Sequence, residues 1–301
     1  MSAGDTLLSV FVLDVAVTDS AGAGGRRDRP ALGVAATDRV GYSDLMKIAI
    51  AGKGGSGKTS ISGTMARLLA RDGFNVLAID GDSNPNLALT LGIPATRMSD
   101  MPVLPSNLLR RTEAGPVLTQ SLEEIKASHS VTGPDGVELL VMAHPQHADT
   151  GCLCSMHATV RRIIEAASEE DRDVCLLDTE ASPEHLSRGT ASYADAMLAV
   201  VEPYFKSLET GRRMAALAND LGLERVALVA NKVRDERELE AVHTFAANHD
   251  LEIAATVPFD ETFALAERAG VAPLDFNPDS PAIEPIRRLA LAWGAGVHGR
   301  A

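Results

Sequence analysis

The sequence predicts an α/β protein, with a doubly wound, mostly parallel sheet flanked by helices in a single domain. Short apolar runs of strand composition alternate with helical segments from Lys47 onward. Several runs, such as 226–230, are apolar throughout, as in strands that are buried on both faces. A glycine-rich stretch, 52–59, lies between the first run and a helical segment. Ligands of such a sheet bind at the carboxyl ends of its strands, so we expect the polar motifs that end these runs to form one site.

The domain is expected to span residues 46–301. The segment 94–134 is its least regular part, and we expect an inserted pair of helices there. Residues 1–45 carry many small residues with Asp and Arg and no sustained hydrophobic period, which predicts a disordered extension. Because Met46 directly precedes the first strand, we expect translation to start there, and N-terminal sequencing of the native protein would test this. The predicted strands are 47–51, 75–80, 137–142, 173–178, 195–201, 225–230 and 252–256.

Composition and charge exclude several classes of protein and of partner. The chain has 301 residues, of which 45% are hydrophobic and 23% charged, values typical of a soluble globular protein. Its net charge of −13 opposes attraction to DNA phosphates and to anionic lipid, so we expect no nucleic-acid partner. No apolar run reaches the length of about 18 residues that a membrane helix needs, so we expect no stable membrane insertion. The 3 cysteines are too few for a disulfide framework, which favours a reducing, cytoplasmic location.

The glycine-rich stretch reads Gly52-Lys53-Gly54-Gly55-Ser56-Gly57-Lys58-Thr59 and matches the phosphate-binding pattern Gly-x-x-x-x-Gly-Lys-Thr. Its glycines allow successive backbone N–H groups to point at phosphate oxygens, and the helix that follows adds its positive N-terminal end. Lys58 would contact the outer phosphates, and the Thr59 hydroxyl would hold Mg²⁺. The competing interpretation is a glycine-rich turn without a ligand. The predicted ATP-binding residues of this loop are Gly54, Gly55, Ser56, Gly57, Lys58, Thr59 and Ser60.

Carboxylates follow two of the predicted strands. Asp80 and Asp82 come at the end of the second strand, where they are placed to position Mg²⁺ or water; a capping and turn cluster is the competing interpretation. Asp178 ends the apolar run 174–177, which is typical of the carboxylate that contacts Mg²⁺ beside a phosphate-binding loop. The segment 179–190 would then respond to the γ-phosphate.

Cys152 and Cys154 are separated by one residue, so both thiolates can face a soft or borderline metal ion. One chain supplies only two of the four ligands of a tetrahedral site, and a two-fold axis would supply the other pair. The competing interpretation is a pair of reduced thiols without a metal. Cys175 lies within an apolar run and is expected in the core.

The additional lysine of the loop, Lys53, creates the variant Lys-Gly-Gly-x-Gly-Lys-Thr. This variant resembles the deviant Walker A loop of a class of dimeric ATPases that includes nitrogenase iron protein, cell-division and partition ATPases, and nickel-insertion ATPases. The resemblance implies an ATP-dependent homodimer in which Lys53 reaches the partner's nucleotide and Asp82 orients the attacking water. It also implies that Asn231 binds the adenine edge and that the loop at Pro258 covers the base.

A narrower resemblance rests on the loop together with the segments 151–154, 178–190, 201–203 and 207–210. These segments are similar to those of the CooC-type accessory ATPases of carbon monoxide dehydrogenase. That family implies a Ni²⁺ or Zn²⁺ ion held between subunits by Cys152 and Cys154, and delivery of nickel to the active-site cluster of the dehydrogenase. The sequence departs from the family pattern at Thr179, where Met is expected.

Two other functions stay open on the sequence alone. A membrane- or DNA-associated positioning or regulatory ATPase of the same fold commonly needs a basic amphipathic tail, whereas the segment 286–293 looks like a docked last helix. An iron–sulfur electron-transfer ATPase would also use four cysteines per dimer. ATP-dependent binding to liposomes and the visible absorbance of the purified protein distinguish these two functions from that of a metallochaperone.

Overall fold

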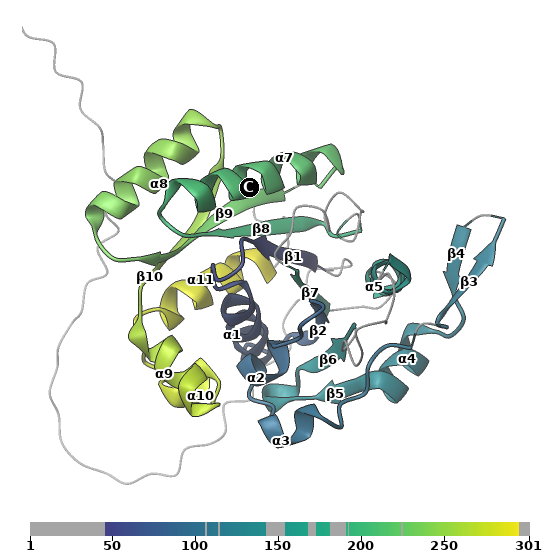
Figure 1. The fold of residues 1–301 in the computed structure, drawn as a ribbon. Helices are drawn as coiled ribbons and strands as arrows, with labels where there is room; N and C mark the ends of the chain where they lie inside the picture. The colour runs from purple at the N-terminus through teal and green to yellow at the C-terminus, as the bar shows by residue number, and fades with distance from the viewer. Residues whose placement is uncertain are drawn as a thin grey trace, which may run out of the picture. The chain divides into compact units, whose positions relative to one another are not determined.

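An eight-stranded sheet forms the centre of the described part of the chain (Figure 1). The computed structural model describes residues 46–105, 107–113, 115–142, 154–167, 173–180, 191, 193–223 and 225–294. The strand order is β10-β9-β8-β1-β7-β2-β6-β5, and neighbouring strands are parallel except β5 and β6. The strands are β1 (Met46–Gly52), β2 (Asn75–Gly81), β5 (Ser130–Thr132), β6 (Glu138–Val141), β7 (Asp173–Thr179), β8 (Ala196–Val201), β9 (Arg225–Val233) and β10 (Glu252–Pro258).

Each of the seven predicted strands is present, and the predicted mostly parallel α/β fold is confirmed. The central strands carry near-continuous apolar runs because both faces of the sheet are covered. In β1, Ile48 and Ile50 enter one hydrophobic core, whereas Ala49 and Ala51 enter the other. Successive side chains of a strand point to opposite faces, so this single run contributes to both cores.

Helices pack on both faces of the sheet. Figure 1 shows α7 and α8 on one side of β8, β9 and β10, and α11 on the other. One core contains side chains of α1 (Lys58–Arg71), α2 (Leu87–Leu91) and α11 (Ile283–Gly294). The other contains side chains of α4 (Leu122–His129), α5 (Cys154–Ala166), α7 (Phe205–Asp220) and α8 (Glu236–Asn248). The remaining described helices are α3 (Ala95–Met98), η1 (Pro134–Gly136), α9 (Glu261–Ala269) and α10 (Pro273–Phe276).

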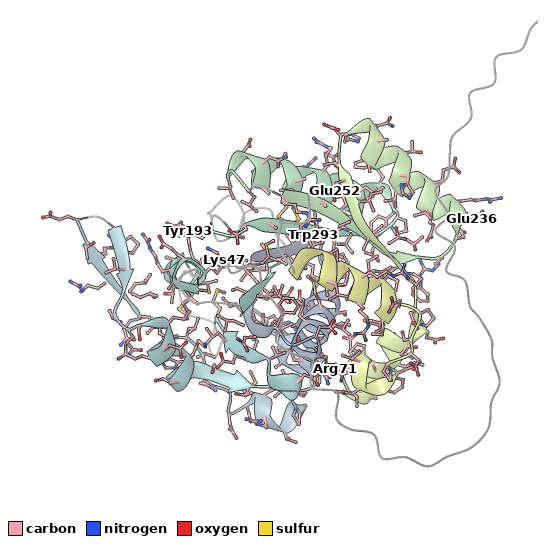
Figure 2. All side chains as sticks on the ribbon, turned by 180° about the vertical axis from the view of Figure 1, so that it is seen from behind. Lys47, Arg71, Tyr193, Glu236, Glu252 and Trp293 are labelled. Atoms are coloured by element: carbon pink, nitrogen blue, oxygen red, sulfur yellow. The ribbon has the colours of Figure 1, made fainter. Side chains whose placement is uncertain are left out.

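The last helix, α11, is docked, as the sequence predicts. It packs against α1 and β10, and its Trp293, labelled in Figure 2, is 1% exposed. The Arg225 guanidinium carbon lies 3.7 Å from the centroid of the Trp293 ring. Ile286 and Leu289 are also buried. This helix therefore uses its apolar face in the core of the domain.

The expected pair of helices in 94–134 is only part of what the segment contains. Its two helices, α3 and α4, are separated by the hairpin of β3 (Leu109–Thr112) and β4 (Gly115–Leu118), and α4 leads into the antiparallel strand β5. Both hairpin strands are only partly buried, so they lack the apolar pattern that identifies a strand in a sequence. The start of α4 does carry a sequence signal, because Ser121 and Glu124 form a capping box.

The described residues all lie in one compact unit, in agreement with the predicted single domain. Within the described ranges, no helix combines the length and apolar character needed to cross a membrane. The proposed extension 1–45 lies outside the described residues and stays a prediction.

Candidate functional site

The phosphate-binding loop predicted at 52–59 joins the carboxyl end of β1 to α1 in the middle of the sheet. Two of its glycines have no space for a side chain. A Cβ at Gly52 would collide with the Val200 carbonyl oxygen of β8, and a Cβ at Gly57 would collide with the side-chain amide of Asn231. Gly57 also has φ 95°, in the left-handed region that favours glycine. Glycine is therefore required at both positions for the loop to pass so close to the neighbouring strands.

The loop and the start of α1 offer hydrogen-bond donors and the Lys58 ammonium group, which together suit an anionic ligand. α1 begins at Lys58 without an acidic residue in its first turn, so its free N–H groups and its dipole favour negative charge. The Ser56 hydroxyl is buried and has no hydrogen-bond partner among the described residues. Burial lowers the pKa of Lys58, and attraction to Asp178, Asp82 and Glu180 opposes this shift. A buried, unpartnered hydroxyl beside a buried amine fits a polyphosphate ligand.

Two buried carboxylates lie side by side next to this loop. Asp80 of β2 and Asp178 of β7 are paired in the parallel register, and each is 1% exposed. Burial raises the pKa of Asp80 to about 6, and burial with repulsion from Asp80 raises the pKa of Asp178 to about 7. The Thr59 side chain hydrogen-bonds to Asp178, and Ser62 Oγ donates to Asp178 Oδ1 over 3.1 Å. Hard oxygen ligands suit Mg²⁺, so Thr59, Asp80 and Asp178 fit the predicted magnesium site.

Asp82 lies partly buried in the turn between β2 and α2. Its Oδ1 accepts a hydrogen bond from the Asn84 N–H over 2.9 Å, and its own N–H donates to Asp80 Oδ1 over 3.2 Å. Asp80 Oδ2 accepts from the Leu87 N–H at the start of α2 over 2.8 Å. These are the contacts of the capping and turn interpretation. The Asp82 carboxylate is also close enough to attract the Lys58 ammonium group. Its role in orienting water stays a prediction.

Asn231 and Pro258 lie at the same edge of the sheet. Asn231 is 7% exposed near the end of β9, and its Nδ2 donates to the Ser56 carbonyl oxygen over 2.7 Å. This contact ties β9 to the phosphate-binding loop. Pro258 ends β10, where it is paired with Val233. The roles of Asn231 and Pro258 at an adenine base stay predictions.

Three residues without a predicted role complete this edge of the sheet: Glu202, Tyr204 and Lys232. Lys53 Nζ donates to the Tyr204 hydroxyl over 3.4 Å and lies 5.1 Å from the centroid of its ring. The Tyr204 hydroxyl donates to Glu202 Oε2 over 3.0 Å, and Lys232 Nζ pairs with Glu202 Oε1 at 3.1 Å. Lys232 Nζ also donates to the Gly55 carbonyl oxygen. Polar residues at the ends of buried strands were the available sequence signal for Glu202 and Lys232.

The predicted thiolate site is only partly within the described chain. Cys152 lies outside the described residues. Cys154 is the first residue of α5, and only its backbone is described. The described residues contain no group of three or more His, Cys, Asp or Glu side chains arranged to hold a metal ion. Metal binding by the pair therefore stays a prediction. Cys175 is confirmed as a core residue: it is 1% exposed, and burial raises the pKa of its thiol to about 12.

A parallel α/β sheet with this loop, the buried Lys58 and the carboxylates Asp80 and Asp178 at its carboxyl edge defines a P-loop ATPase. The family described as the CobQ/CobB/MinD/ParA nucleotide binding domain matches residues 47–274. The chain belongs to this family. The predicted ATPase activity and the use of ATP with Mg²⁺ agree with that membership.

Relatives and solved structures support the same assignment. The chain is 35% identical over 242 residues to the carbon monoxide dehydrogenase accessory protein CooC of Rhodospirillum rubrum. The matched residues cover 77% of this chain and 91% of that protein. It is also 35% identical over 258 residues to an uncharacterized ATP-binding protein of Methanocaldococcus jannaschii, with 81% and 96% covered. The septum site-determining protein MinD from Pyrococcus horikoshii, solved as a complex with Mg-ADP, has the same fold, with a TM-score of 0.62 and 19% identity over 85% of this chain and 100% of that one. The similarity to CooC supports the CooC-type resemblance.

Proposed function

We propose that this ATPase is a homodimeric metallochaperone that carries nickel for the maturation of carbon monoxide dehydrogenase or of a related nickel enzyme. The observation that carries the proposal is the 35% identity to CooC over most of both chains. The pair Cys152 and Cys154 adds to it, because thiolates are the residue type that such a cargo requires.

Each residue group of the nucleotide site has a role in the proposed hydrolysis of ATP. The N–H groups of the loop and Lys58 bind the phosphates, and Thr59, Asp80 and Asp178 hold Mg²⁺, which neutralises phosphate charge. Asp82 orients the attacking water. Lys53, which contacts Tyr204 within its own subunit, reaches the nucleotide of the second subunit when two copies associate.

The cargo site would lie on the two-fold axis. Two copies of the Cys152 and Cys154 pair supply four thiolates, the number that a tetrahedral Ni²⁺ or Zn²⁺ site takes. α5 begins at Cys154 and is followed along the chain by β7, which carries Asp178. The chain between the metal pair and the magnesium ligand is therefore short. Nucleotide hydrolysis and metal release would then act on the same equilibrium between arrangements of the dimer.

Equilibrium nickel binding to the chelator-stripped full chain tests this function, with mass measured by light scattering. We expect about one Ni²⁺ per dimer and the loss of tight binding in Cys152→Ser with Cys154→Ser, while nucleotide binding is retained. Thiolates must be deprotonated to bind, so affinity should rise with pH. Equal nickel affinity in the double variant would contradict the site.

The same preparation tests the two other functions. Brown colour with visible absorbance would favour an iron–sulfur electron-transfer ATPase. ATP-dependent sedimentation with liposomes would favour a positioning ATPase. The docked helix α11 argues against the latter, because its apolar side is already buried on α1 and β10.

A further inference from the structure

The phosphate-binding loop contains a peptide unit that glycine leaves free to rotate. Gly54 and Gly55 are both exposed, and glycine adopts positive and negative φ with similar ease. A rotation of the peptide between Gly55 and Ser56 would exchange the direction of its carbonyl oxygen with that of its N–H group. Because a carbonyl oxygen that faces a bound anion would repel it, a contact that holds this oxygen from outside the loop favours anion binding.

Two consecutive residues of β9 make contacts of this kind. Asn231 Nδ2 donates to the Ser56 carbonyl oxygen over 2.7 Å, and Lys232 Nζ donates to the Gly55 carbonyl oxygen. The carbonyl oxygen and N–H of one trans peptide point in opposite directions, so each contact also fixes an N–H. For the Gly55 peptide this is the Ser56 N–H, which donates to the Lys53 carbonyl oxygen over 3.1 Å.

Lys232 is itself held in an unusual position. Its φ is 61°, in the left-handed region that residues with a side chain rarely adopt. Its ammonium group pairs with Glu202 Oε1 at 3.1 Å, and Glu202 lies directly after β8. The second oxygen, Glu202 Oε2, accepts from the Tyr204 hydroxyl over 3.0 Å. Strained backbone at a binding site is retained where the side chain it directs is needed.

We infer that Lys232, held by Glu202, is a positioning residue of the nucleotide site: its ammonium group holds the Gly55 carbonyl oxygen, which would repel a phosphate, and so fixes the loop from which the remaining N–H groups bind phosphate. The inference rests on the ATPase function and deepens it. The contact is a charge-assisted hydrogen bond to a neutral carbonyl, which is stronger than the contact between two neutral groups. Lys232 reaches the nucleotide through the loop, so its removal weakens binding in the ground state and in the transition state alike.

The experiment compares Mg-ADP affinity, measured by calorimetry, in Lys232→Met and in the matched control Lys126→Met. Lys126 lies on α4 and also pairs with two carboxylates, Glu123 and Glu138. Glu138 begins β6, so this pair lies at the amino end of that strand, away from the loop. We expect Kd to rise about tenfold in the Lys232 variant and to stay within about twofold in the control. KM for ATP should rise by a similar factor, while kcat changes less than about threefold.

Lys232→Gly separates positioning from stability. Glycine suits φ 61°, so this variant should lose affinity about tenfold without a lower melting temperature than that of the wild-type protein. Wild-type affinity in both Lys232 variants would overturn the inference. An equal loss in Lys126→Met would also overturn it, because the effect would then be one of stability. If the wild-type protein and the control also fail to bind Mg-ADP, the ATPase function itself is wrong.

Discussion

Asp178→Asn should stabilise the nucleotide-free protein at pH 8 while it abolishes ATPase activity. The wild-type carboxylate is buried beside Asp80, and its pKa is raised from 3.8 to about 7. That difference corresponds to ~4 kcal/mol at about 1.36 kcal/mol per pKa unit. The amide carries no charge and can still accept the hydrogen bond from Ser62. We expect the free energy of unfolding at pH 8 to rise by at least ~1 kcal/mol. The rise is smaller than the full ~4 kcal/mol because the buried amide N–H₂ group must find new hydrogen-bond partners.

The pH dependence gives this prediction its sign. The folded-state pKa of Asp178 lies above the unfolded value, so the folded protein binds the proton more tightly. The stability that this proton provides is fully present below about pH 4 and is lost as pH rises through about 7. At pH 5 the wild-type side chain is mostly protonated, and the Asn substitution should then change stability little. The gain should therefore appear at pH 8 and largely disappear at pH 5.

Thermal unfolding in the presence of EDTA measures the effect, and a gain of ~1 kcal/mol raises the melting temperature by about 2–4 °C. The exposed Asp279→Asn is the matched control and should show no such pH dependence. Mg-ADP should reverse the order of stability, because it stabilises the protein that binds it. A lower melting temperature for Asp178→Asn at pH 8, or the same shift at both pH values, would refute the reasoning.

Two further predictions concern single side chains. Lys58→Ala should abolish ATPase activity and weaken Mg-ADP binding by at least about tenfold, because it removes the buried amine of the loop. Phosphate release measures the activity, and calorimetry measures the binding. Turnover near the wild-type rate would contradict this prediction. Arg67→Met should lower the free energy of unfolding by ~2 kcal/mol in urea titrations, since Arg67 pairs with Asp135 at 2.7 Å and with Asp275 at 2.6 Å. Arg71 also pairs with Asp135 but is partly exposed, so Arg71→Met should lower the free energy of unfolding by less. An equal loss in both variants would show that the burial of Arg67 does not cause the effect.

The strands and the loop were predictable because their signals are local. Strands covered on both faces carry near-continuous apolar runs, so β1, β8 and β9 stand out in the sequence. The loop 52–59 has glycines and Lys58 at fixed spacing. The hairpin of β3 and β4 escaped prediction because its strands are only partly buried, and their composition then carries no period.

The sequence by itself determined the fold class, the phosphate-binding loop and the carboxylates that follow two strands. Only the tertiary structure decided which of these residues meet. Repulsion from Asp80 adds to the raised pKa of Asp178 because β2 and β7 are neighbours in the sheet. Lys232 reaches Gly55 across 177 residues of sequence because their strands end at the same edge of the sheet. Strand order is set by how helices pack the two cores, a property of the whole chain that no local pattern contains.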